Sequence, residues 1–149
     1  MKAAILEKMK ERGLKLTPQR LSIIDALVDK ALLHPSADLI YHEAKKSAKS
    51  LSLSTVYATL GELSKHRIIQ LLEFDTMENR YELDVTPHVN VVCKECKKIL
   101  DYELPFLINS QAVLRRLRFF VTDSRFDFYG YCEKCRNRLD IPLKNQDLD

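Results

Sequence analysis

Apolar residues recur at helical spacing through the first 66 positions of the chain. A first helix is expected to stop at Gly13, because glycine breaks helices at their carboxyl end. A second helix is predicted to open at Thr17-Pro18, since threonine caps a helix and proline suits its first position. The apolar positions are Ala4, Ile5 and Met9 in the first helix and Leu21, Ile24, Leu27 and Val28 in the second.

Two more helices are predicted before residue 67. Pro35-Ser36 opens one that runs through Ala44, and Ser52 or Ser54 caps another that runs over 55–66. The positions expected to face the core are Ala37, Ile40, Tyr41 and Ala44, then Val56, Leu60 and Leu63. Short strand-like runs follow at 68–74 and 80–83, around a turn-forming segment. Helices followed by a hairpin of this size predict a winged helix-turn-helix.

The pattern changes again at about residue 88. Strands rich in β-branched and aromatic residues are predicted over 89–92, 98–102 and 119–131. A helix is predicted over 105–117, and the polar tail after Arg136 is expected to fray. The apolar positions of that helix are Phe106, Leu107, Val113, Leu114 and Leu117. We therefore predict an α+β chain with one domain over 1–83, a hinge at 84–87 and a second domain over 88–149.

Composition narrows the class of protein. With 149 residues, 46% hydrophobic and 30% charged, the chain has the balance of an ordinary globular protein rather than a disordered one. Its apolar runs are far shorter than the ~18 residues of a membrane span, and its first 14 residues lack the apolar core of a signal peptide. We expect a cytoplasmic protein with no membrane partner. The net charge of +3 permits nucleic-acid binding without establishing it.

The cysteines form two Cys-x-x-Cys pairs, each in polar, turn-like sequence. The four residues are Cys93, Cys96, Cys132 and Cys135. A two-residue spacer lets a tight turn aim two sulfurs at one metal, and a reducing cytoplasm disfavours disulfides. The spacing therefore predicts a structural zinc site with four cysteine ligands. The alternative is a redox dithiol switch, which would lose zinc under mild oxidation.

The start of the predicted fourth helix is a candidate for DNA recognition. Ser54, Thr55 and Tyr57 lie there, and a recognition helix enters the major groove with its first residues. The alternative is a capped surface helix with no DNA role. No lysine or arginine stands between Ser50 and Ser64, so basic residues elsewhere are expected to neutralise phosphates. The candidates are Lys15, Arg20, Lys49 and the wing.

Five ordered segments carry a family resemblance. They are Leu16-Thr17-Pro18-Gln19-Arg20, His34-Pro35-Ser36-Ala37-Asp38, Leu53-Ser54-Thr55-Val56-Tyr57, the run from His88 through Cys93 to Cys96, and the run from Tyr129 through Cys132 to Cys135. Together they resemble the Fur (ferric uptake regulator) family of metal-dependent transcription regulators. Within that family the chain is similar to the PerR branch of peroxide sensors.

The resemblance implies an N-terminal winged-helix DNA-binding domain and a C-terminal α/β dimerisation domain that holds one structural Zn(II) per subunit. It implies a homodimer on a palindromic double-stranded operator, with regulatory Fe(II) or Mn(II) between the domains. The implied regulatory ligands are His34, Glu82, His88, Asn90 and Asp101. The candidate DNA contacts are Lys15, Thr17, Arg20, Ser54, Thr55 and Tyr57.

The sequence departs from the family pattern at several positions. Asn90 stands where a second histidine is usual, and Glu82 stands where peroxide sensors typically carry aspartate. Ser124 replaces a histidine of an additional metal site, so we predict that this site is absent. Ala58 and Gly61 replace polar or basic residues of the recognition helix, so the operator is expected to differ from those of well-known members.

The sequence as a whole predicts a dimeric, metal-responsive repressor of peroxide-stress or metal-homeostasis genes. An enzyme is not expected, because four protein ligands leave no open position on the zinc. Two alternatives stay open: an iron- or zinc-uptake regulator without peroxide sensing, and a zinc-ribbon interaction protein that does not bind DNA.

Overall fold

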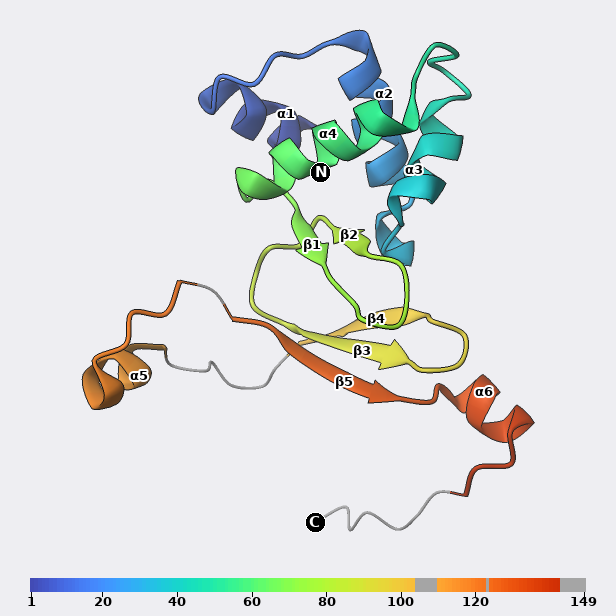
Figure 1. Cartoon of the computed structure of the whole chain (residues 1–149), viewed down its shortest axis with the longest axis vertical. Coiled ribbons are helices and arrows are strands. Elements are labelled where there is room, and N and C mark those ends of the chain that lie inside the picture. The colour runs from blue at the N-terminus through green and yellow to red at the C-terminus, as the bar shows by residue number, and fades with distance from the viewer. Residues whose placement is uncertain (104–109, 123, 143–149) are drawn as a thin grey trace. The chain divides into compact units, whose positions relative to one another are not determined.

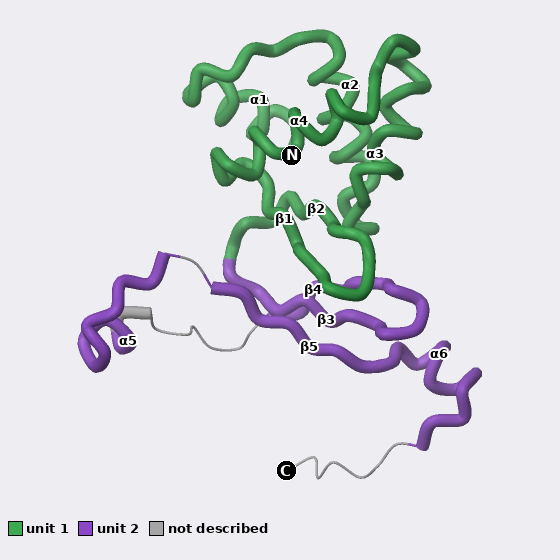
Figure 2. The backbone as a smooth tube through the Cα atoms, viewed as in Figure 1, with its two compact units in different colours: residues 1–86 green, residues 87–149 purple. Residues whose placement is uncertain are grey.

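The computed structural model describes residues 1–103, 110–122 and 124–142. The chain divides into two compact units, unit 1 (residues 1–86) and unit 2 (residues 87–149), which Figure 2 shows in different colours. None of the helices in the described part of the chain has the length and apolar character needed to cross a membrane.

Unit 1 is a helical bundle that ends in a two-stranded antiparallel hairpin (Figure 1). Its elements are α1 (Lys2–Glu11), α2 (Pro18–Asp29), the 3-10 turn η1 (Ala31–Leu33), α3 (Ala37–Ala44), α4 (Leu53–Lys65), β1 (Gln70–Leu72) and β2 (Arg80–Glu82). The four predicted helices and the wing-like hairpin are thus confirmed.

Side-chain caps fix where these helices begin. The hydroxyls of Thr17, Ser36 and Ser52 each accept a hydrogen bond from the backbone N–H three residues further on, at 3.2–3.3 Å. Ser52, and not Ser54, therefore caps α4. The first helix closes ahead of Gly13, whose φ of +69° is the left-handed conformation that glycine adopts without strain.

The core of unit 1 is built from α1 to α4 and the hairpin. The predicted stripe of α2 was partly wrong, because Leu21 and Val28 are only half-buried while Ile23 and Ala26 are buried. Helix α2 packs against both α3 and α4, so its buried face is wider than a single stripe. In α3, Tyr41 is likewise only half-buried. The buried positions predicted for α4 are confirmed, with Thr59 added to them.

Unit 2 is a three-stranded sheet of order β4-β3-β5, in which β3 pairs antiparallel with β4 and parallel with β5. Its elements are β3 (Val89–Cys93), β4 (Ile99–Tyr102), α5 (Ser110–Leu117), β5 (Phe126–Gly130) and α6 (Glu133–Arg138). The α+β fold class is confirmed by the two units together.

Three predictions for unit 2 need comment. The strand predicted over 119–131 occupies only 126–130, because only that part pairs with β3. The helix predicted over 105–117 is described from Ser110, and its residues 105–109, with Phe106 and Leu107, lie outside the described residues. The tail expected to fray after Arg136 instead continues α6 to Arg138.

Strand register gives the sheet of unit 2 two different faces. Residues paired across strands share a face, and alternate residues along a strand lie on opposite faces. One face carries Val91 with its partners Leu100 and Phe128. The other face carries Asn90 with its partners Asp101 and Asp127. The first face is thus apolar, while the second combines the polar row at Asn90 with the buried apolar pair of Val92 and Ile99.

Candidate metal centres and nucleic-acid interface

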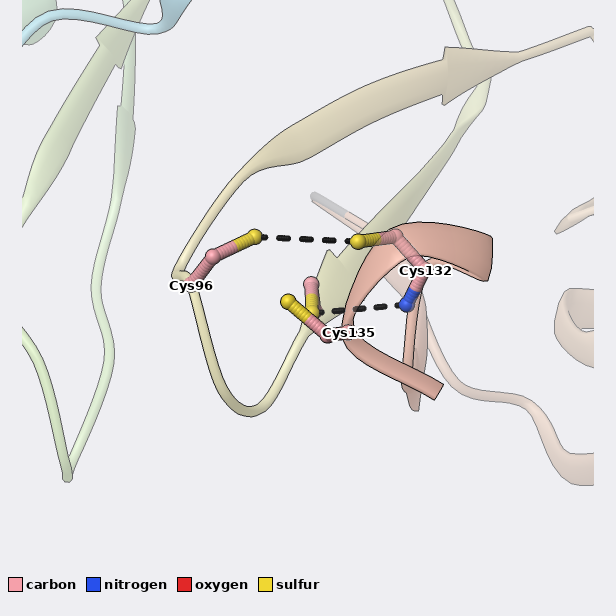
Figure 3. Close-up of side chains that lie close together, drawn as sticks. Cys96, Cys132 and Cys135 are labelled. Atoms are coloured by element: carbon pink, nitrogen blue, oxygen red, sulfur yellow. Dashed lines mark hydrogen bonds between the residues drawn. The ribbon is translucent and has the colours of Figure 1, made fainter. Parts of the chain in front are cut away.

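The two Cys-x-x-Cys pairs meet in unit 2 (Figure 3). Cys93 ends β3 and Cys96 lies in the turn before β4, while Cys132 caps α6 and Cys135 lies in its first turn. The four sulfur atoms all lie within 4.8 Å of one another, and the sulfurs of Cys96 and Cys132 are 3.8 Å apart. Tetrahedral zinc with Zn–S bonds of ~2.3 Å separates its sulfurs by roughly 3.8 Å.

Backbone hydrogen bonds hold the first cysteine pair against β5. The N–H of Lys94 donates to the carbonyl of Gly130 at 2.8 Å, directly after the pairing of Cys93 with Gly130. The N–H of Cys132 donates to the sulfur of Cys93 at 3.4 Å. Lys97 closes the turn in the left-handed region, at φ 62°. The pairing of β3 with β5 therefore brings together two cysteine pairs that lie far apart in the sequence.

The thiols strongly affect one another's ionisation. Burial raises the pKa of Cys93, but backbone N–H groups of Cys132, Cys96 and Glu95 outweigh it and lower that pKa to about 6. Burial raises the pKa of Cys135 to about 12, and the three neighbouring thiols add to this. The cluster therefore favours the thiolate of Cys93 and disfavours the thiolate of Cys135. A bound divalent cation stabilises all four thiolates at once. The cluster therefore fits a structural zinc site whose four coordination positions are all filled by cysteine.

A second pair of candidate ligands lies in unit 1. The N–H of Tyr81 donates to the carbonyl of Pro35 at 2.9 Å, which ties β2 to the segment before α3. This bond sets Glu82 beside His34, whose backbone is left-handed at φ 45°. His34 Nε2 and Glu82 Oε1 are 3.6 Å apart, and their side chains are only 4% and 3% exposed. Two ligands bound to one ion at ~2.1 Å each are typically 3–4 Å apart, so this pair suits a metal.

The remaining predicted regulatory ligands lie in unit 2. Asn90 and Asp101 are paired across β3 and β4, and His88 immediately precedes β3. Asn90 is 2% exposed, and its Oδ1 has no hydrogen-bond partner among the described residues. Buried carbonyl oxygens normally have a partner, and an amide oxygen is a good donor to a hard cation. Asn90 is thus suited to bind an ion.

The beginning of α4 exposes a cluster of hydroxyl groups. Ser52 Oγ lies 2.9 Å from Ser54 Oγ and 2.8 Å from Thr55 Oγ1. Tyr57, the fifth residue of α4, is 54% exposed. It lines a cavity of about 170 Å³ together with Asp38 and Glu78. Lys15 and Thr17 are also exposed. The helix start is accessible, as a recognition helix requires.

Arg20 has an intramolecular role. Its guanidinium bonds to the carboxylate of Glu62 on α4 and to the carbonyl of Lys15. The side chain is 21% exposed. Arg20 therefore links α2 to α4 and orients the predicted recognition helix, and the structure does not present it as a free cation.

Sequence reasoning missed one polar cluster, which lies at β5. Arg125 Nη2 lies 2.6 Å from Asp127 Oδ2, Arg125 Nε donates to Asp127 Oδ1 at 2.9 Å, and the Tyr129 hydroxyl donates to Asp127 Oδ2 at 2.9 Å. The signal was present as charged and polar residues at alternate positions of a predicted strand. Its meaning depends on the neighbouring strand, which the sequence does not show.

A winged-helix unit combined with a second unit that carries a four-cysteine metal site defines a metal-dependent DNA-binding regulator. The model of the ferric uptake regulator family matches residues 11–129, and the chain belongs to that family. Members of this family are transcription regulators rather than enzymes.

Individual relatives agree with this assignment. The chain is 30% identical to the peroxide operon regulator of Bacillus subtilis (strain 168) over 134 residues, which cover 89% of this chain and 92% of that protein. The fold is similar to that of the Helicobacter pylori ferric uptake regulator, whose structure reveals three functional metal binding sites: the TM-score is 0.73 at 27% identity, over 91% of this chain and 94% of that one. It is also similar to the Campylobacter jejuni peroxide stress regulator, with a TM-score of 0.65 at 28% identity over 87% and 98% of the two chains.

Substituting one zinc ligand tests the structural role of the four-cysteine site. We expect Cys96→Ser to release zinc and to convert a dimer into a poorly folded monomer, because metal binding and folding are coupled in such sites. Metal analysis, sedimentation and thermal melting measure the three effects. Glu95→Gln in the same turn is the matched control and retains zinc. A Cys96→Ser protein that stays dimeric with an unchanged Tm contradicts a structural role.

Proposed function

We propose that this protein is a metal-dependent transcriptional repressor that controls peroxide-stress genes. The observation that carries the proposal is the buried pair of His34 and Glu82 in unit 1. His34 precedes α3, and Glu82 lies on the wing strand β2. A metal held by both side chains fixes the wing relative to the helices, so metal binding and DNA binding are coupled within one unit.

The proposed regulatory metal is Fe(II) or Mn(II), distinct from one structural Zn(II) per subunit at the cysteines. Its proposed ligands are His34, Glu82, His88, Asn90 and Asp101. Imidazole suits iron, and carboxylate and amide oxygens suit harder ions such as manganese. A metal that binds one conformation of the protein more tightly than another shifts the population toward that conformation.

The apolar face of the unit 2 sheet supports a homodimer. Leu100, Tyr102 and Phe128 are 46%, 53% and 61% exposed on that face. Monomeric proteins rarely expose a contiguous apolar patch, and a second copy is the partner that covers such a face symmetrically. A twofold dimer reads a palindromic double-stranded operator, with one winged unit on each half-site. Such DNA lies in the cytoplasm, which also keeps the four thiols reduced.

The start of α4 is the proposed recognition element, with Ser54, Thr55 and Tyr57 toward the DNA. The acidic residues Asp38 and Glu78 line the cavity beside Tyr57. Negative charge there disfavours a phosphate, so we assign Tyr57 to a base edge in the major groove. Lys15 and Thr17 are assigned to phosphates, and Arg20 supports them by holding α2 against α4.

Substitution of Tyr57 tests the recognition element. We expect Tyr57→Ala to weaken operator binding by about 1–3 kcal/mol per half-site, the usual cost of one lost base contact. A gel shift at fixed salt measures it, with zinc content and dimer mass as controls. Tyr57→Phe keeps the aromatic ring but removes the hydroxyl. Its operator affinity therefore distinguishes a contact of the ring with a thymine methyl group from a contact of the hydroxyl. Unchanged affinity in Tyr57→Ala would move the recognition element elsewhere.

Substitution of the histidines tests the metal switch. His34→Ala and His88→Ala are each expected to abolish metal-stimulated DNA binding and to retain the zinc, because only the regulatory site loses a ligand. His42→Ala is the matched control, since that side chain is 67% exposed and paired with Asp38. Gel shifts with and without Mn(II), together with metal analysis, give both readouts. Metal-stimulated binding that survives both substitutions rules out this ligand set.

Peroxide sensing has its own test. We expect the Fe(II) form, treated with low peroxide, to gain one oxygen atom on the peptides that hold His34 or His88, and the Mn(II) form to gain none. The expected extent of oxidation is weak to moderate, because the two departures from the usual ligands have opposite expected effects. Glu82 is expected to restrict the access of peroxide to the iron, whereas Asn90 is expected to leave a coordination position open. Peptide mass spectrometry and a parallel gel shift measure it. Intact histidines with full DNA binding would place this protein with metal-uptake regulators that do not sense peroxide.

A further inference from the structure

The register of unit 2 places three polar side chains in one row across the sheet. Asn90 on β3 is opposite Asp101 on β4 and opposite Asp127 on β5. Asn90 is 2% exposed, and its Oδ1 has no hydrogen-bond partner in the described part of the chain. Two carboxylates thus flank a buried amide oxygen that is suited to bind a cation.

Side chains close to Asp127 in the sequence hold its carboxylate. Both oxygens of Asp127 accept contacts from Arg125, at 2.9 Å from Nε and 2.6 Å from Nη2. The Tyr129 hydroxyl donates to the same carboxylate at 2.9 Å. Tyr129 shares the face of Asp127 on β5, and Arg125 immediately precedes that strand. Asp127 is therefore held by residues that precede and follow it in the sequence.

We propose that Arg125 is a positioning residue that lowers the affinity of the regulatory metal site for hard divalent ions by keeping Asp127 from becoming a ligand. This inference rests on the proposed function, since it takes Asn90 and Asp101 as ligands of the regulatory metal. Arg125 acts on the metal through Asp127 and does not contact the metal itself.

The geometry explains why Asp127 needs to be restrained. Neighbouring strands lie about 4.8 Å apart, so the Asp127 side chain is within reach of an ion bound at the amide of Asn90. A carboxylate is a strong ligand for Mn(II) and similar hard ions. The two-point contact with a guanidinium is among the strongest that a carboxylate makes. It also cancels the charge of Asp127, so the nearby ion gains little from it.

Mn(II) titration of the zinc-loaded, full-length protein tests the inference, with the free Mn(II) followed by electron paramagnetic resonance. We expect Arg125→Gln to lower the Kd for Mn(II) by about 10- to 100-fold, the usual range for groups that position metal ligands. Asp127→Asn alone leaves the charge of Arg125 near the ion without the carboxylate that offsets it, so the informative control removes both charges. The double variant Arg125→Gln/Asp127→Asn is expected to return to the wild-type Kd.

A purely structural role for Arg125 predicts a different pattern. In that case Arg125→Gln lowers the Tm with no change in the Kd for Mn(II), which overturns the inference. A double variant that keeps the tighter Mn(II) binding of Arg125→Gln also overturns it, because the gain in affinity would then not depend on the Asp127 carboxylate. Arg125→Lys keeps the charge but loses the two-point contact, so it provides a milder variant that is expected to tighten Mn(II) binding by a smaller factor.

Failure of the proposed function gives a separate result. If the zinc-loaded wild type binds neither Mn(II) nor Fe(II), no regulatory site exists and both proposals fall. If the wild type and the Arg125→Gln variant bind Mn(II) equally well, the proposed role of Arg125 is wrong and the proposed regulatory site still stands.

Discussion

The parallel pairing of β3 with β5 is the interaction on which unit 2 depends. It sets Cys93 opposite Gly130, and the second cysteine pair follows within two residues. The same register sets Asn90 opposite Asp127. One strand pairing therefore builds the four-cysteine cluster at one end and the polar row in the middle. Because the thiols resist full ionisation without a cation, the metal in turn stabilises this pairing.

In unit 1, a single backbone hydrogen bond brings the candidate metal ligands together, as strand pairing does in unit 2. The bond from Tyr81 to Pro35 joins the wing to the start of α3, and it sets His34 and Glu82 side by side. Burying a carboxylate costs several kcal/mol unless a counter-charge compensates it. In the proposed regulator, a divalent ion bound by Glu82 supplies positive charge where the wing meets the helices, in the same unit that carries α4.

Local patterns predicted much of this structure, and pairings between distant segments account for what they missed. The caps at Thr17 and Ser52 and the cysteine spacing are encoded within a few residues, and each was predicted. The strand over 119–131 was predicted too long, because aromatic content does not reveal where a partner strand begins and ends. Helix α6 was missed because six residues show no apolar period. The ion pair of Arg20, a predicted DNA contact, was not foreseen because its partner Glu62 lies 42 residues away in the sequence.

The two metal centres of the proposed regulator differ in the net charge of the metal ion and its ligands. Four thiolates around Zn(II) carry a net charge of about −2, and lysines beside both cysteine pairs offset it. The excess of negative charge on the four sulfur ligands favours tight, permanent binding of the zinc. The regulatory set contains two carboxylates, Glu82 and Asp101, so a divalent ion there is balanced with no excess. Asn90 adds a neutral oxygen, and Arg125 cancels the third nearby carboxylate, Asp127. A regulatory metal has to leave when its concentration falls, and a balanced site of oxygen and imidazole ligands releases it more readily than four thiolates do.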